Sequence, residues 1–94
     1  MNRLGVALEL QGKIELAVLC FRKALNIEDE LPEVHCNLGD ALNALGKKDE
    51  AAACYQRAIQ LKPDYPAAYN SLGNALMGQD KADEAIRCYQ QALQ

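Results

Sequence analysis

Apolar residues recur at helical spacing along the whole chain, as two stripes in each unit of 34 residues. In the central unit one stripe runs from Leu38 to Leu45, and a second runs from Ala51 to Leu61 after a polar break at residues 46–48. Residues three and four positions apart lie on one face of a helix, whereas a half-buried strand would alternate at every second residue. The pattern therefore predicts an all-α protein built from short amphipathic helices.

The stripes and the breaks between them place six helices. Their expected ranges are about 1–11, 14–27, 33–45, 48–61, 67–78 and 82–94. Pro63 ends the fourth helix, and Pro66 is tolerated in the first turn of the fifth. Asp64 and Asp80 precede the last two helices, where we expect their carboxylates to cap backbone N–H groups.

The three units repeat in register without insertion or deletion. The segment from Leu4 to Phe21 returns as residues 38–55 and again as residues 72–89. Glycine recurs inside each first helix, at Gly5, Gly39 and Gly73, although it costs about 1 kcal/mol there relative to alanine. We therefore expect these glycines to allow close packing of the second helix, together with the small residues Ala17, Ala51 and Ala85.

This register resembles the tetratricopeptide repeat (TPR), a helix–turn–helix unit of about 34 residues. The residues that carry the resemblance are Tyr69, Leu72 and Gly73, their counterparts His35, Leu38 and Gly39, the pairs Ala17/Phe21, Ala51/Tyr55 and Ala85/Tyr89, and Pro63. Leu8, Leu42 and Leu76 depart from it by standing where the family has tyrosine. The resemblance implies one domain, a right-handed α-solenoid of three TPR units at about 1–31, 32–65 and 66–94, that serves as a scaffold for protein–protein interaction.

The amino-acid composition narrows the classes of partner that the chain can bind. The chain has 10 Lys and Arg against 13 Asp and Glu, a net charge of −3, and this acidic balance argues against nucleic acid as a ligand. Its apolar runs are too short to cross a bilayer, and it begins without a signal-peptide pattern. We therefore expect a cytoplasmic protein with no membrane partner, whose four cysteines are free thiols.

No residue cluster predicts catalysis, a metal or a cofactor. Cys20, Cys54 and Cys88 recur with the repeat, so they lie on neighbouring helices about 8–10 Å apart, too far for a shared zinc ion or a disulfide. His35 is the single histidine and occupies the slot of Tyr69, which favours a packed or half-buried role. Cys36 is expected to face solvent and to react first with a thiol reagent.

The TPR resemblance implies that the first helix of each unit lines a concave groove that binds an extended peptide or a partner helix. The groove residues predicted in this way are Asn2, Arg3, Val6 and Glu9; Glu33, Cys36, Asn37, Asp40 and Asn43; and Ala67, Asn70, Ser71, Asn74 and Met77. An ordinary polar helix surface is the alternative interpretation of the same residues. The carboxylate clamp of some TPR proteins falls on Asn2, Val6, Asn37, Ala67 and Ser71, which lack its lysines and arginine, so acidic tails are disfavoured.

Self-assembly is the alternative function. The first unit is truncated at its start and the last at its end, which predicts either a fragment of a longer TPR array or a homo-oligomer formed through uncapped terminal helices. The residues expected to mediate this association are Ala85, Ile86, Tyr89 and Leu93. Leu4, Leu8 and Leu10 offer a similar apolar surface at the other end.

Overall fold

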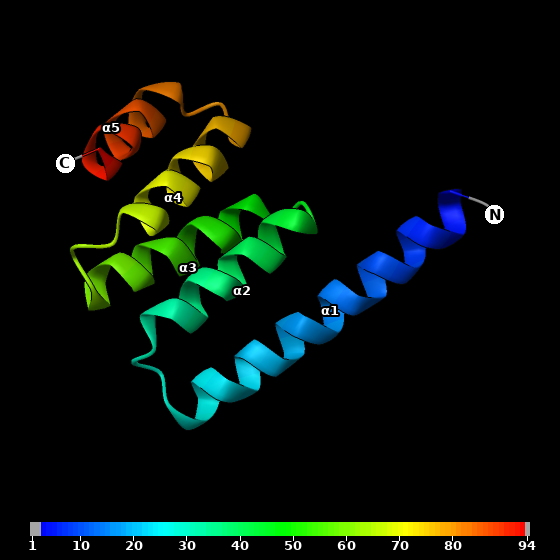
Figure 1. Ribbon diagram of the computed structural model, residues 1–94. Helices are drawn as coiled ribbons and strands as arrows, with labels where there is room; N and C mark the ends of the chain where they lie inside the picture. Colours follow the sequence, from blue (N-terminus) through cyan, green and yellow to red (C-terminus); the bar gives the residue numbers. More distant parts are fainter. Residues whose placement is uncertain (1–2, 94) are drawn as a thin grey trace.

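The computed structural model describes residues 3–93, with side chains described for residues 12–93. The expected all-α fold is confirmed: across the described residues the chain forms helices and no strand (Figure 1). The helices are α1 (Arg3–Ile27), α2 (Pro32–Ala44), α3 (Lys48–Leu61), α4 (Pro66–Gly78) and α5 (Ala82–Ala92).

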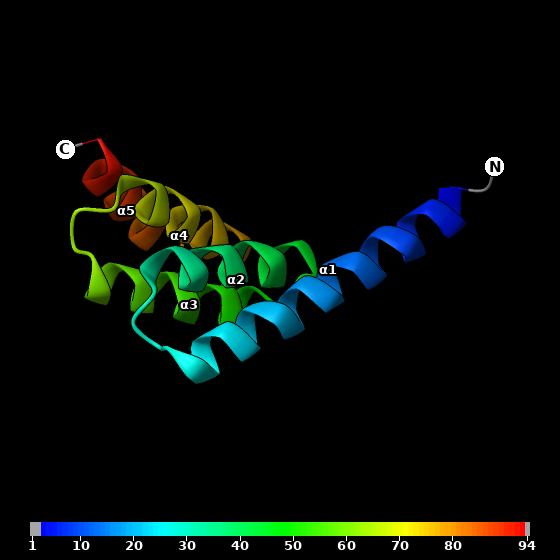
Figure 2. The same cartoon turned by 60° about the horizontal axis from the view of Figure 1, so that its bottom comes forward.

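Two helical hairpins form the body of the molecule. Helix α2 packs on α3 and α4 packs on α5, while contacts of α3 with α4 and of α1 with α2 stack the units side by side (Figure 2). The core lies along these contacts and includes the apolar stripes that the periodicity predicted. Leu38, Leu42, Ala51, Tyr55 and Ala58 are at most 3 % exposed, because the apolar stripes of α2 and α3 face each other.

The glycines inside the first helices allow the close packing that their register predicted. A Cβ atom at Gly39 would lie 2.7 Å from Cε1 of Tyr55, and one at Gly73 would lie 2.6 Å from Cε1 of Tyr89. The space without a side chain is therefore occupied by the aromatic ring of the following helix. Gly5 is outside the residues whose side chains are described.

Helix α1 corrects the expected pair of helices at 1–11 and 14–27, because it continues through Gly12 without a turn (Figure 1). The equivalent residues of the other units are Gly46, with φ of 81°, and Asp80, with φ of 61°, and both end a helix in the left-handed region. The helix that follows each turn has Asp-Glu in its first turn, which favours a helix start. Position 16 of the first unit is leucine instead, so the signal to start a second helix is weaker there.

The expected caps at Asp64 and Asp80 are also wrong. The residues that precede α4 and α5 are Tyr65 and Lys81, and neither end has a side-chain cap hydrogen bond. Asp80 instead adopts the left-handed conformation that closes α4, a role for which aspartate is among the more tolerant residues. Pro66 occupies the first turn of α4 as expected.

Candidate functional site: a polar face on α2 and α4

The solvent-exposed face of α2 and α4 carries most of the predicted groove residues. Asn37 and Asp40 of α2 and Asn70 and Asn74 of α4 are exposed to solvent, and Glu33, Ala67 and Met77 are exposed as well. Equivalent positions of α2 and α4 present the same face because the two helices begin neighbouring copies of one unit. Asn2 lies outside the described residues, and Arg3, Val6 and Glu9 lie in the part of α1 whose side chains are not described.

Two of these polar side chains are held by the aromatic residue of the next helix. The Tyr55 hydroxyl donates a hydrogen bond to Oδ1 of Asp40 at 2.6 Å, and the Tyr89 hydroxyl donates to Oδ1 of Asn74 at 2.6 Å. Asp40 and Asn74 are equivalent in the repeat, so the same contact is made in successive units. A tyrosine that fills a glycine recess thus also orients a residue of the predicted groove.

The central contact extends to α4. Ser71 of α4 lies near the Tyr55 hydroxyl, so residues of α2, α3 and α4 come together around this phenol. Burial and the neighbouring Asp40 carboxylate raise the pKa of Tyr55 far above its ordinary value of 10.0. The phenol therefore stays protonated and serves as a fixed donor to Asp40.

Cys36 does not meet its expectation as the most accessible thiol. It is buried, with 6 % of its surface exposed, and Tyr65, in the segment between α3 and α4, lies near its sulfur. Burial raises the pKa of the Cys36 thiol, and the nearby carboxylates of Asp40 and Glu33 raise it further. Cys20 is the exposed cysteine, because it lies on the open side of α1.

Two lysines reduce the negative charge of this face. The Nζ atom of Lys62 lies 3.6 Å from Oε1 of Glu33 and 4.8 Å from the centre of the Tyr65 ring. Lys48 donates a hydrogen bond of 3.1 Å to Oδ1 of Asn43. Asn43 is half-buried, and its amide oxygen already accepts this hydrogen bond within its own unit.

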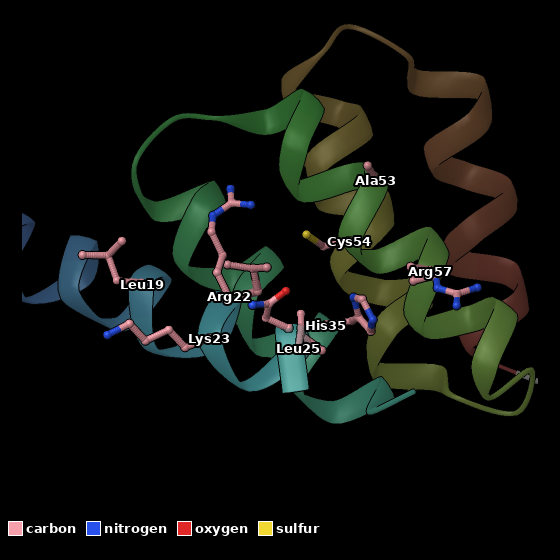
Figure 3. Close-up of a pocket in the computed structure, with 10 residues that line it drawn as sticks. Leu19, Arg22, Lys23, Leu25, His35, Ala53, Cys54 and Arg57 are labelled. Atoms are coloured by element: carbon pink, nitrogen blue, oxygen red, sulfur yellow. The ribbon is translucent and has the colours of Figure 1, made fainter. Parts of the chain in front are cut away.

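A concave region lies away from this face, and sequence reasoning missed it. It is a hollow of about 660 Å³ between α1, α2 and α3, lined in part by Leu19, Leu25 and Cys54. Arg22 and Lys23 of α1 and Arg57 of α3 also line it, and Figure 3 shows the charged ends of Lys23 and Arg57 pointing away from its centre. Arg22 lies 3.9 Å from Oε1 of Glu50. The lining of this hollow combines apolar and basic side chains. Only the stacking of α1 against α2 brings these residues together.

The last hairpin offers part of the predicted self-association surface. Ile86 is 51 % exposed and Leu93 is 88 % exposed, whereas Ala85 is 0 % exposed because it packs inside the hairpin. Ala85 is therefore not available to a partner. Tyr89 is half-buried and lines a hollow of about 490 Å³ together with Leu93.

All four cysteines are free, and within residues 12–93 no three His, Cys, Asp or Glu side chains come together as metal ligands would. His35 is half-buried, and its Nε2 lies 2.9 Å from the carbonyl oxygen of Asp29. No described helix is long and apolar enough to cross a membrane.

Comparison with known families decides the identity of the fold. A model described as TPR repeat matches residues 5–46 and 39–80, and a tetratricopeptide repeat model matches residues 67–94. The chain belongs to the TPR family. TPR units are a protein-interaction fold, and none of the curated proteins matches this sequence.

Several solved TPR structures resemble the chain closely. A crystal structure of MamA is 28 % identical with a TM-score of 0.84 and is matched over 96 % of this chain and 53 % of MamA. The first TPR of Spaghetti (RPAP3) bound to the HSP90 peptide SRMEEVD is 28 % identical with a TM-score of 0.85, over 95 % of this chain and 71 % of that one. The second TPR of Spaghetti, bound to the same peptide, has a TM-score of 0.84 and 25 % identity, over 95 % and 82 %. The TPR chain thus spans about half the length of the MamA structure.

Proposed function

We propose that this TPR chain binds a segment of another protein along the polar face of α2 and α4. The observation that carries the proposal is the repeated contact in which Tyr55 and Tyr89 hold Asp40 and Asn74 at 2.6 Å. Side chains held before binding lose less conformational entropy when a ligand arrives. Support also comes from the Spaghetti structures, which carry a peptide on the same fold.

The chemistry of the face selects the class of segment. Asn37, Asn70 and Asn74 each offer a donor and an acceptor, which suits the backbone of an extended peptide. Asp40 adds an acceptor with negative charge. Ala67 and Ser71 stand where a carboxylate clamp needs cations, so the groove favours neutral or basic segments over acidic tails such as the one in SRMEEVD.

Titration of labelled peptides tests this assignment. We expect Asn37→Ala to weaken binding of a neutral or basic peptide by about 1–3 kcal/mol, because backbone groups of a buried ligand would be left unpaired. Gln56→Ala is the matched control, since Gln56 is an exposed amide on α3. Equal affinity of both variants contradicts the groove assignment.

An acidic peptide needs a separate control because of the basic hollow between α1 and α3. Binding that disappears in Arg57→Gln belongs to that hollow, whose lining includes Arg57. Binding of a poly-acidic peptide that survives Arg57→Gln and high salt, and is lost in Asn37→Ala, contradicts the proposed charge preference of the groove.

Self-association through α5 is the second candidate function, favoured by the exposure of Ile86 and Leu93. Apolar side chains exposed together on one helix are a common feature of protein contact sites. A charge at the end of α5 opposes such a contact, so Leu93→Lys should move the chain toward monomer. Light scattering over a range of protein concentrations measures the effect, and an unchanged mass contradicts this function.

A further inference from the structure

One face of α1 is incompletely covered. Ala17, Phe21 and Ala24 are half-buried, whereas the equivalent residues of α3, 34 positions later, are at most 1 % exposed. In the central unit α2 covers that face of α3. Residues 3–11 are the sequence equivalent of α2, but in α1 they continue the same straight helix and project away from the other helices (Figures 1 and 2).

The sequence of residues 3–11 nevertheless matches the uncovered face. Leu4, Gly5 and Leu8 repeat Leu38, Gly39 and Leu42, the residues of α2 that pack on α3. Gly39 leaves space for the ring of Tyr55, and the first unit has glycine and phenylalanine at the equivalent positions, Gly5 and Phe21.

The hydrogen bond between Tyr55 and Asp40 has no counterpart in the first unit, because both residues are replaced there. Tyr55 donates to Asp40 in the central unit, whereas the first unit has Phe21 and Val6 at these positions. A phenylalanine facing an aspartate would leave a polar group without its donor, but a phenylalanine facing a valine leaves none. The paired replacement indicates that residues 3–11 and the Phe21 face are made to pack on each other.

We propose that this packing occurs between two copies of the chain, with the α1 helices antiparallel and residues 3–11 of each copy covering Ala17, Phe21 and Ala24 of the other. A straight α1 separates residues 3–11 from the Phe21 face of the same copy. It leaves them free to reach that face on a second copy. Exchange of an identical element between copies is a low-cost route to a dimer, because it reuses contacts already specified by the sequence.

The register of the central hairpin sets the geometry of the dimer. Gly39 faces Tyr55 there, so a shift of one unit places Gly5 of one copy opposite Phe21 of the other. The two-fold axis then passes beside residues 12 and 13. Gly12 is exposed, and a Cβ atom built on it would have no neighbour within 4 Å in one copy, so α1 is uncovered beside the axis.

The dimer is tested in the Leu93→Lys background, which separates it from association through α5. We expect analytical ultracentrifugation of this variant to show a concentration-dependent dimer. Gly12→Ala should tighten the dimer by about fivefold or more, because alanine favours the continuous helix over the turn. A monomer at every concentration overturns the proposal, and so does a dimer that Gly12→Ala leaves unchanged or weakens.

Mixing two variants tests the exchange itself. Gly5→Leu fills the recess for Phe21, and Phe21→Ala removes the ring, so each variant alone should dissociate about tenfold more readily or worse. An equimolar mixture contains a dimer in which one contact is native and the other pairs the enlarged residue with the reduced one. We expect the mixture to recover most of the original affinity, while Asn26→Ala, at an exposed position of α1, serves as the control.

A hairpin closed within one copy predicts no recovery on mixing, because the two altered positions never meet. That result, or a Gly5→Leu chain that dimerises as tightly as its parent, overturns the exchange.

Discussion

Gly39→Ala tests the close packing of a tyrosine ring on a helix glycine, a contact that both hairpins contain. The new Cβ atom would lie 2.7 Å from Cε1, 2.9 Å from Cζ and 3.0 Å from Cδ1 of the Tyr55 ring. Tyr55 is 1 % exposed and its hydroxyl is bonded to Asp40 at 2.6 Å. The ring therefore has no open space to move into, and a shift that relieves the clash stretches the hydrogen bond.

The expected change in the free energy of unfolding combines two destabilising contributions and one stabilising contribution. Overpacking of a filled core costs about 1–3 kcal/mol. A weakened hydrogen bond costs about 0.5–1.5 kcal/mol more, and alanine gains about 1 kcal/mol over glycine inside a helix. We expect the free energy of unfolding to fall by about 1–3 kcal/mol.

Gly12→Ala is the matched control, because it makes the same substitution inside a helix where nothing lies within 4 Å of the new atom. There we expect a gain of about 0.5–1 kcal/mol. Urea unfolding followed by circular dichroism, at two protein concentrations tenfold apart, separates stability from association. If Gly39→Ala stabilises the chain as Gly12→Ala does, the close-packing argument is wrong.

Three further outcomes are expected. Tyr55→Phe should lower the free energy of unfolding by about 0.5–1.5 kcal/mol, measured by urea unfolding, because it removes the hydrogen bond to Asp40 and keeps the ring; no change would show that the bond contributes nothing. Burial raises the pKa of Tyr65 from 10.0 to about 12, so the folded chain holds that proton more tightly than the unfolded one. The free energy of unfolding should then fall as pH rises from about 10 to 12, and Tyr65→Phe should flatten this decline. Cys20 should react first with a thiol reagent and Cys36 last, as judged by mass spectrometry of the labelled protein; a fast Cys36 would contradict its burial.

Periodicity and register alone were sufficient for the fold and the core. Leu38, Leu42 and Tyr55 are buried as their spacing predicts, because one face of an amphipathic helix must be removed from water whatever covers it. The in-register glycines likewise predicted a close contact that the structure contains at Gly39 and Gly73. These features repeat every 34 residues, so each was specified more than once in the sequence.

The tertiary structure decided the features that depend on small energy differences or on contacts between segments far apart in the sequence. The continuity of α1 at Gly12 depends on a local preference between turn and helix of about 1 kcal/mol, which the repeat register does not report. Cys36 was placed on the groove face by its register, but it is buried, and Tyr65 lies near its sulfur in a connecting segment outside the helical pattern. The basic hollow is lined by Arg22 of α1 and Arg57 of α3, and only the stacking of the units brings both helices to one hollow. Helical spacing determines which side of a helix is buried, whereas neighbours far apart in sequence determine which exposed side chains come together.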